Sequence, residues 1–369
     1  MNFIGPTNTV GIIDSEETTL ALLQQALTMG FKVVVLTQDP KSITIPGIRI
    51  IQGDYQEVAK LQLLFDCSDI VVYDSEFLHL DHLDQITDRH KLVQGTEMLE
   101  LVQDRYLEKS FLNDHNLNIV PYAAVIDDAD LAKTVEEIGF PCILKPIQKS
   151  VHSLDGVIFQ DAAELENYHV PHGSFVLESY LDIKQEQIVL INKDDRQKNV
   201  TYPIIRLNCQ DRWSHTISLY QQNEAWLTSE IEEIAQTIAQ NIDYQGLFAV
   251  KLCITTTDML YVQRIYLGTM FEANIYQAVT NYSQEELFWR SVCNWPLPQV
   301  SVHQDACNLV FTKANLTRAI DLITQHPQWQ LQYCPNLAQL NPYLGYLTVF
   351  GQDQTQLQHY INPTQIWQI

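Results

Sequence analysis

The sequence predicts a mixed α/β and α+β chain with a parallel, Rossmann-like sheet domain at its N-terminal end. The first observation is an alternation of short apolar runs and amphipathic runs over roughly the first hundred residues. The second is a change after that point, where several apolar runs follow one another without helical segments between them. A chain of 369 residues is long enough for two or three domains.

In the N-terminal part, each predicted boundary carries a local signal. A helix over residues 15–30 has Ser15 as its expected N-cap and Gly30 as its stop. A second helix is expected over residues 55–67. The strands are rich in Val and Ile and are expected over residues 8–14, 31–37, 47–54 and 69–76. Strands that are separated by helices pair in parallel, so this order predicts a Rossmann-like sheet.

The rest of the chain is predicted to hold a small α+β unit and then successive antiparallel strands. One long helix is expected over residues 96–117, where apolar side chains recur at helical spacing. Further helices are expected over 128–139, 229–242 and 315–325. Further strands are expected over 120–126, 140–147, 155–160, 174–181, 185–193, 199–208, 247–255, 259–265, 306–312 and 345–351.

The composition argues against binding to nucleic acid or to an anionic membrane. Asp and Glu total 45, Lys and Arg total 22, and the net charge is −23. The N-terminus lacks the pattern of a signal peptide, and no apolar run approaches the ~20 residues of a membrane span. The seven cysteines form no CxxC pair, which favours buried free thiols. We therefore expect a soluble, cytoplasmic protein.

Two cations stand inside apolar strands near residue 250. Lys251 interrupts "LFAVKLCIT" and Arg264 interrupts "MLYVQRI". Long cationic side chains are seldom buried without a partner. They indicate a structural salt bridge, an anion site, or the remains of a different site.

Four segments then occur in a fixed order: "QDRYLEKSFL", "GFPCILK", "VLESYL" and "NPYLGYLTVFG". This order resembles the ATP-grasp superfamily, and most closely its carboxyaminoimidazole ribonucleotide synthase family. The resemblance implies an ATP-grasp fold with a Rossmann-like N-terminal domain (1–104), an ATP-grasp domain (105–298, small subdomain about 121–175) and a small C-terminal domain (299–369). It further implies a homodimer and the ATP-dependent carboxylation of aminoimidazole ribonucleotide in purine biosynthesis, with magnesium ions held by carboxylates.

The resemblance also implies nucleotide-binding roles for several residues. Arg105 matches an arginine near the ATP phosphates, and Lys145 matches the lysine that reaches the α- and β-phosphates. Glu186 matches the acid that binds the ribose. The hinge that binds adenine is matched by Glu178, Ser179, Tyr180 and Leu181. Without the resemblance, these side chains are also consistent with solvated positions on a helix and on strands.

The two buried cations are departures from the family pattern. Lys251 falls at the first metal-binding glutamate of the family, and Arg264 falls at the second. Because magnesium requires hard anionic oxygen ligands, we expect no metal site here. Either the two cations pair with internal acids, for which Glu186 and Glu272 are the candidates, or they hold an external anion such as a phosphate.

Both glycine-rich loops of the family are also altered. The loop that covers the ATP phosphates reads "PIQKSVHSLDG", which keeps Gly156 and adds bulky Val151 and Leu154. The loop that cradles the ribonucleotide phosphate reads "IIDSEETTL". It places the carboxylates of Asp14, Glu16 and Glu17 where a phosphate would bind.

We interpret the chain as an ATP-grasp protein with degenerate metal and phosphate sites that is catalytically inactive and still binds a nucleotide or another anion. ATP is then a candidate ligand, and magnesium is not expected. Two alternatives remain open. One is an active carboxylating ligase of the purine pathway, and the other is a structural or interaction protein that binds no nucleotide.

Overall fold

The computed structural model describes residues 3–14, 19–41, 43, 45–74, 76–78, 80–149, 156–166, 168–196, 198–210, 213–334, 342–367 and 369. The expected N-cap Ser15 and the acidic Glu16 and Glu17 lie outside these residues, as do Val151 and Leu154 of the altered phosphate loop. Among the described residues, no helix has both the length and the apolar character that crossing a bilayer requires.

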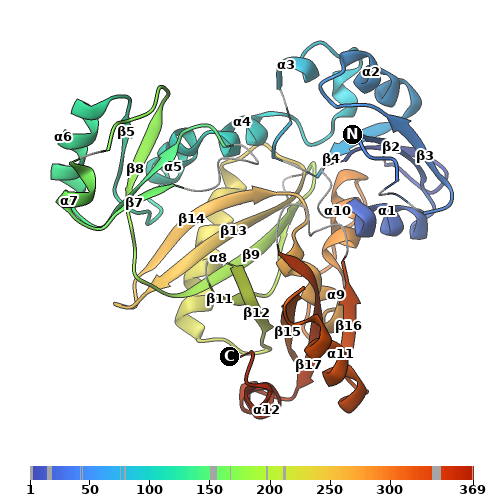
Figure 1. The fold of residues 1–369 in the computed structure, drawn as a ribbon. Helices are drawn as coiled ribbons and strands as arrows, with labels where there is room; N and C mark the ends of the chain where they lie inside the picture. The colour runs from blue at the N-terminus through green and yellow to red at the C-terminus, as the bar shows by residue number, and fades with distance from the viewer. Residues whose placement is uncertain are drawn as a thin grey trace.

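The N-terminal part forms the predicted parallel sheet, so the fold prediction is confirmed there (Figure 1). The strand order is β3-β2-β1-β4, and every pairing is parallel. The strands are β1 (Thr9–Ile13), β2 (Lys32–Thr37), β3 (Ile48–Gln52) and β4 (Ile70–Tyr73). The helices are α1 (Thr19–Thr28), α2 (Val58–Cys67) and the short α3 (Leu80–Leu83).

The single helix expected over residues 96–117 is wrong in one respect, because it is broken at Asp104. Helix α4 (Glu97–Gln103) ends there and α5 (Arg105–Asp114) begins. The carboxylate of Asp104 accepts hydrogen bonds from the backbone N–H groups of Tyr106 and Leu107. This N-cap satisfies donors that a continuous helix would have paired internally, so the break carries little energetic cost.

A small antiparallel sheet follows, with the strand order β5-β8-β6-β7. Its strands are β5 (Tyr122–Val125), β6 (Cys142–Pro146), β7 (Val157–Phe159) and β8 (Phe175–Ser179). Helices α6 (Asp128–Ile138) and α7 (Ala162–Leu165) belong to the same unit. A small core of its own, which includes Val125, Leu131 and Leu144, stabilises this unit.

The largest sheet has nine strands in the order β14-β13-β9-β11-β12-β15-β17-β16, with β10 paired to β9. Its strands are β9 (Ile183–Lys193), β10 (Asn199–Thr201), β11 (Ile205–Gln210), β12 (Trp213–Leu219), β13 (Gly246–Thr255), β14 (Leu260–Leu267), β15 (Asp305–Thr312), β16 (Gln330–Tyr333) and β17 (Tyr343–Gly351). The strand expected over 199–208 is therefore two strands. Pro203, which has no N–H to donate, lies between them.

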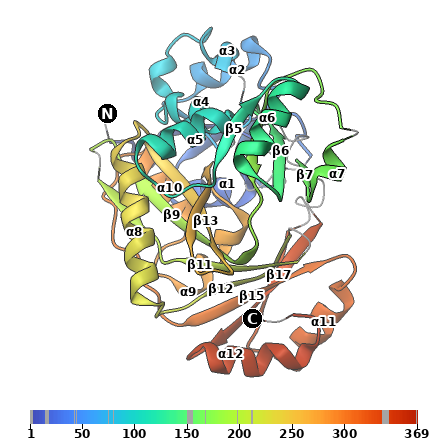
Figure 2. The same cartoon turned by 90° about the vertical axis from the view of Figure 1, so that its left-hand side faces the viewer.

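The C-terminal part extends this large sheet, since β15 pairs with β12. Helix α8 (Ala225–Gln240) covers one face beside β9 and β13, and α10 (Gln284–Val292) covers the other together with the short α9 (Tyr276–Val279). Helices α11 (Leu316–Gln325) and α12 (Gln354–Ile361) pack on β15 and β17 (Figure 2). The small sheet and the N-terminal sheet lie on opposite sides of the large sheet's upper end (Figure 1), and the candidate site lies between the small sheet and the large sheet.

Candidate nucleotide site

A cavity of about 260 Å³ lies where the small sheet, α5 and the strands β9, β13 and β14 meet. The residues to which the sequence assigns nucleotide contacts all line it: Arg105, Lys145, Glu178, Ser179, Tyr180, Leu181, Glu186, Lys251 and Arg264. They come from α5, from both antiparallel sheets and from the segment that joins them. The fold thus brings together positions that are widely separated in the sequence.

One carboxylate in the cavity is held between two lysines. Glu178 on β8 is buried, and its Oε2 lies 3.1 Å from Nζ of Lys145 and 3.3 Å from Nζ of Lys109. Burial alone would raise the pKa of Glu178, but the two lysines outweigh burial and lower it. The Lys109 side chain is 6% exposed and the Lys145 side chain 27% exposed, so Lys145 is the one that an incoming anion can reach.

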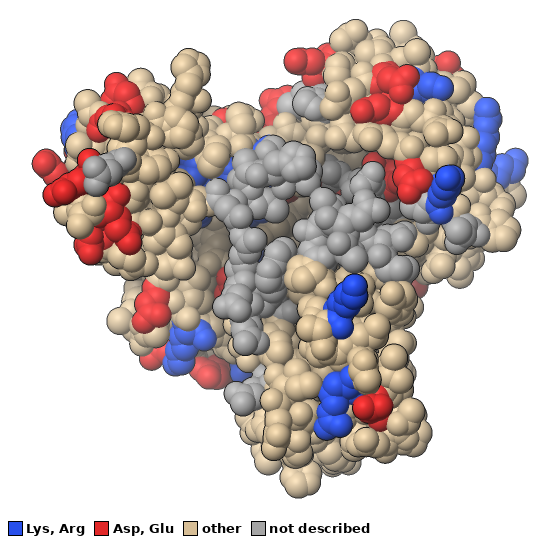
Figure 3. Space-filling view, viewed as in Figure 1, with Lys and Arg blue, Asp and Glu red and all other residues tan. Residues whose placement is uncertain are grey.

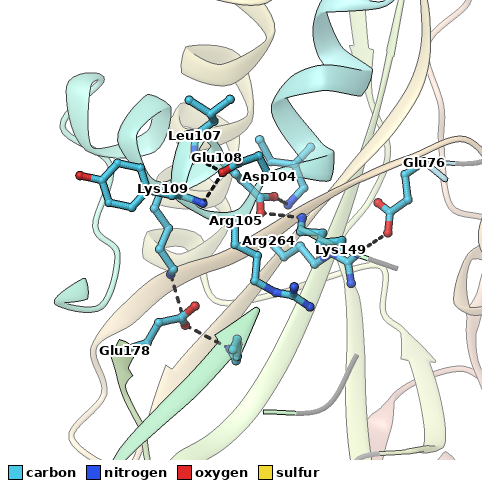
Figure 4. A network of polar contacts seen from close by, with 12 residues as sticks. Glu76, Asp104, Arg105, Leu107, Glu108, Lys109, Lys149, Glu178 and Arg264 are labelled. Carbon is cyan, nitrogen blue, oxygen red and sulfur yellow. Dashed lines mark hydrogen bonds and ion pairs between the residues drawn. The ribbon is translucent and has the colours of Figure 1, made fainter. Parts of the chain in front are cut away.

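Helix α5 carries a stripe of charged side chains on its buried face (Figure 4). Lys149, after β6, forms an ion pair with Glu108 at 2.7 Å, and its side chain is only 1% exposed. The other oxygen of Glu108 accepts a hydrogen bond from the backbone N–H of Ile265 at 2.6 Å. Arg105 donates to the carbonyl oxygen of Pro146 at 2.7 Å, and burial lowers its pKa. These contacts hold α5 to both antiparallel sheets.

Sequence reasoning gave no binding role to Glu108, Lys109 or Lys149. For Glu108 and Lys109 a signal was nevertheless present, because Arg105, Glu108, Lys109 and Leu112 recur at helical spacing and form one buried face of α5. A charged stripe on the buried face of a helix indicates an internal polar site.

Lys251 and Arg264 lie directly opposite each other on β13 and β14. Like charges in this register repel unless each has its own partner. Lys251 Nζ lies 2.9 Å from Oε1 of Glu186 on β9, so one of the two internal pairings predicted from the sequence is confirmed. The second oxygen of Glu186 accepts from the thiol of Cys209 at 2.8 Å. Burial, followed by the Glu186 charge, raises the pKa of Cys209 to about 12, so this thiol stays protonated as a donor.

Arg264 pairs with Glu76, whereas the sequence had suggested Glu186 or Glu272. Glu76 follows β4 in the N-terminal part, and the Arg264–Glu76 contact spans 188 residues of sequence (Figure 4). The guanidinium also lies 4.3 Å above the ring of Tyr266. Within the described residues, Nε of Arg264 and Oε2 of Glu76 are buried without a hydrogen-bond partner. The pair is therefore only partly satisfied.

A second carboxylate after β4 fixes the same contact between the N-terminal part and β14. Asp74 accepts from the backbone N–H of Thr269 at 2.6 Å and from its hydroxyl at 2.7 Å. Gly268 has a positive φ of 82°, and a Cβ there would lie 2.2 Å from a carboxylate oxygen of Asp74. Only glycine permits this close approach.

The charge of the cavity lining is opposite in sign to that of the whole chain. Among the described residues, six Lys and Arg side chains but three carboxylates line it, whereas the chain carries −23. Figure 3 shows Asp and Glu side chains gathered on the outer surfaces of the small-sheet unit and of the N-terminal part. The three carboxylates of the lining are Glu108, Glu178 and Glu186, and each is engaged by a lysine. Across the described residues, no three His, Cys, Asp or Glu side chains are grouped to hold a metal ion.

The hinge segment has part of its backbone committed internally. The N–H of Ser179 donates to the carbonyl of Pro121, and the N–H of Tyr180 donates to the carbonyl of Pro141. These bonds fix the segment against the small sheet. A ring bound at this position would therefore contact a preformed edge.

Two family models match the chain. The ribonucleotide synthetase preATP-grasp domain matches residues 7–103, and the ATP-grasp domain matches residues 110–266. An N5-carboxyaminoimidazole ribonucleotide synthase of Staphylococcus epidermidis is 26% identical over 365 residues, covering 96% of this chain and 95% of that protein. One from Staphylococcus aureus is 24% identical over 355 residues, covering 94% of each chain.

Solved structures show the same fold over nearly the whole length. The S. aureus N5-carboxyaminoimidazole synthetase in complex with ADP superimposes with a TM-score of 0.85 at 22% identity, covering 99% of this chain and 98% of that one. The Aspergillus clavatus synthase, in complex with ADP and aminoimidazole ribonucleotide, gives 0.82 at 16% identity and covers 97% of each chain. These likenesses confirm the predicted ATP-grasp fold.

Proposed function

This chain belongs to the ATP-grasp superfamily, in its N5-carboxyaminoimidazole ribonucleotide synthase family, and on that premise we propose that it binds a nucleotide without a metal ion and does not catalyse carboxylation. The nucleotide lies in the cationic cavity between the small sheet and the large sheet. The observation that carries the proposal is the pair of facing cations, Lys251 and Arg264, where the family has metal-binding carboxylates.

The charge balance of the cavity supports metal-free binding. Among the described lining residues, six cations against three carboxylates leave an excess of positive charge for polyphosphate oxygens. Magnesium would cancel two negative charges of the nucleotide and bring its own positive charge close to Lys251 and Arg264. Metal-free ATP or ADP is therefore the better electrostatic match. Magnesium itself does not fit, because the lining carboxylates are held by lysines.

The assigned residues keep their roles within this proposal. Lys145, released from Glu178, and Arg105 contact the α- and β-phosphates, and Lys251 with Arg264 takes the terminal phosphate. The adenine lies against the hinge from Ser179 to Leu181, and Glu186 faces the ribose. Lys109 remains with Glu178, which keeps that carboxylate paired when Lys145 moves.

The absence of catalysis follows from the same arrangement. Phosphoryl transfer needs developing charge on the phosphoryl oxygens to be stabilised, and family members use magnesium for this purpose. Here Lys251 and Arg264 are fixed, so they bind the phosphate of the ground state as strongly as that of the transition state. Such uniform binding increases affinity without enhancing the rate. The loop that the resemblance matches to the ribonucleotide phosphate is altered as well, because it carries the carboxylates of Asp14, Glu16 and Glu17.

Calorimetric titration with ATP in the presence of EDTA, and again with excess magnesium, tests the proposal. We expect saturable binding in EDTA and binding weakened severalfold by magnesium. Arg264→Gln should weaken binding in EDTA by roughly 10-fold or more, as expected for loss of a charge-assisted hydrogen bond. Arg290→Gln is the matched control, because Arg290 pairs with Glu286 away from the cavity. Binding that requires magnesium, or no binding at all, would refute the proposal.

The second candidate is an active synthase, and its support is the similarity over 94–96% of the chain to proteins of that name. Phosphate release that depends on aminoimidazole ribonucleotide and bicarbonate, at ~1 per second or more, would establish it instead. A homodimer is part of our proposal, as in the expectation from the family. Sedimentation velocity at micromolar concentration tests it, and a single monomeric species would count against it.

A further inference from the structure

One stretch of the large sheet carries polar side chains where its neighbours carry apolar ones. Strands β11 and β12 lie between the part of the sheet that α8 covers beside β9 and the part that α11 and α12 cover beside β15 and β17. Residues on this face alternate with buried apolar residues of the other face, such as Leu207 and Ile217. They are Arg206, Asn208, Thr216 and Ser218.

A cavity of about 230 Å³ lies over this polar strip. Its floor is formed by β11 and β12, and its rim includes Lys184 from β9 and Gln354 at the start of α12. Among the described residues that line it there is no Asp or Glu side chain, and Ile369, the last residue of the sequence, also lines it. The chain as a whole has about twice as many acids as bases, so a cavity whose charged side chains among the described residues are Arg206 and Lys184 is unusual for this surface.

Arg206 is the central residue of this cavity. Within the described part of the chain its side chain forms no hydrogen bond and no ion pair, and its Nε is buried without a partner. Its one recorded contact is with the ring of Tyr220, with the guanidinium carbon 5.1 Å from the ring centre. Ser218 lies directly opposite it on β12 and is 3% exposed. A guanidinium N–H that is withdrawn from water and left unpaired is costly, and an anion removes that cost.

We propose that this cavity binds a tetrahedral oxyanion, either free phosphate or the phosphate group of a small ester, through Arg206. The guanidinium offers a planar pair of N–H donors to two oxygens, and the hydroxyls of Thr216 and Ser218 border the remaining side. The ring of Tyr220 keeps the guanidinium plane in position. Lys184 at the rim is paired with Asp258 at 2.6 Å and is exposed, so it attracts the anion without being required for the contact.

This site is independent of the nucleotide cavity. Arg206 lies on β11 next to Leu207, which pairs with Glu186 and points to the opposite face of the sheet. The outcome of its test therefore leaves the proposed nucleotide binding untouched. Arg206→Gln should leave the affinity for metal-free ATP unchanged, whereas Arg264→Gln should leave phosphate binding at Arg206 unchanged.

The test is a titration of ¹⁵N-labelled protein with inorganic phosphate at constant ionic strength, observed through the arginine Nε–H resonances. The resonance that disappears in Arg206→Gln is assigned to Arg206, and we expect it to shift saturably with a midpoint of ~1 mM or below. Arg290 provides the internal control, because its Nε already donates to Glu286 at 3.1 Å and should not respond. A parallel titration with glycerol 3-phosphate separates the two sources. Tighter binding of glycerol 3-phosphate assigns the site to an ester, and tighter binding of phosphate assigns it to the free ion.

A second measurement keeps the proposal open to refutation if that resonance is too broad to follow. Crystals soaked in selenate should show anomalous density within hydrogen-bonding distance of the Arg206 guanidinium, and crystals of Arg206→Gln should show none there. Arg206→Lys should retain the charge but weaken phosphate at least severalfold, because it loses the paired donors. A linear response shared by Arg206 and Arg290, or no selenate density at Arg206, would overturn the proposal.

Discussion

The ion pair between Lys251 and Glu186 offers a sharp test of how the cavity is stabilised. The perturbation is Glu186→Gln, which removes the charge and keeps an oxygen for the thiol of Cys209. In this variant Lys251 is left without its counter-charge while Arg264 stands directly opposite on the neighbouring strand. We expect the variant to be destabilised by more than a lost hydrogen bond, because two like charges then face each other in a site withdrawn from water.

The size of the effect follows from the geometry. Unit charges 2.9 Å apart attract by about 6 kcal/mol at an effective dielectric constant of 20. Desolvation offsets part of this, and breaking a buried pair costs about 3–5 kcal/mol. The side chains of Lys251 and Glu186 are still 21% and 14% exposed, so we expect about 3 kcal/mol, at the lower end. The double variant Lys251→Met with Glu186→Gln removes both charges, so its free energy of unfolding should lie within about 1 kcal/mol of that of the unchanged protein.

Urea unfolding followed by tryptophan fluorescence measures these free energies of unfolding. The unchanged protein, the two single variants and the double variant form a double-mutant cycle, and they are compared in the transition in which the large sheet unfolds. Lys184→Met is the matched control, because Lys184 and Asp258 form an exposed ion pair with side chains 58% and 68% exposed. Because exposed ion pairs contribute little to stability, this control should cost much less than Glu186→Gln. The reasoning is refuted if Glu186→Gln costs no more than the control, or if the double variant is as unstable as the sum of its single variants.

Three further predictions concern the same cavity. Glu76→Gln should increase the affinity for metal-free ATP severalfold in calorimetry, because the Arg264 guanidinium then donates to the phosphate without also pairing with the Glu76 carboxylate. A lower affinity would contradict this competition. Restoring acids with Lys251→Glu and Arg264→Glu should give no magnesium-dependent phosphate release, because the loop ending at Gly156 still lacks the glycines of the family; turnover in a coupled phosphate assay would contradict it. The pKa of Glu178 is lower in the folded chain than its ordinary value of 4.5, so its stabilising effect is present above about pH 4.5 and is lost as the pH falls through the folded pKa. Glu178→Gln should therefore flatten the acid side of the stability profile in urea unfolding, and an unchanged profile would show that other carboxylates cause the acid loss.

Much of the fold could be predicted because the signals are local. The alternation of Val- and Ile-rich runs with amphipathic runs identified β1 to β4 and the helices between them, since period and propensity act within about ten residues. The errors arose where one residue competes with a local pattern. Asp104 caps a new helix inside an apolar helical pattern, and Pro203 interrupts a strand pattern. Strand β12, in which two Ser, a His and a Thr outnumber the three apolar residues, went unpredicted.

The sequence predicted which residues line the cavity, but it predicted only some of the ion pairs that they form. The resemblance located all nine candidate residues on one cavity, because motif order reflects the order of the elements that line it. It did not provide the stripe of Glu108 and Lys109 on α5, or Lys149 as the partner of Glu108. For Glu108, Lys109 and Lys149 alike, the sequence contains other oppositely charged side chains that are equally plausible partners. Composition therefore does not show which ion pairs form.

The sequence alone determined that Lys251 and Arg264 interrupt two apolar runs and that the segment from Pro146 to Gly156 contains a single glycine. These are properties of residue identity, and no folding can alter them. Only the tertiary structure decided that Lys251 pairs with Glu186 on a neighbouring strand while Arg264 reaches Glu76, 188 residues away. The reason is that a buried charge pairs with the carboxylate that packing brings within about 3 Å, and that choice depends on how the N-terminal sheet docks on β14. Docking of this kind is a balance of many weak contacts spread over both surfaces, which no short stretch of sequence encodes.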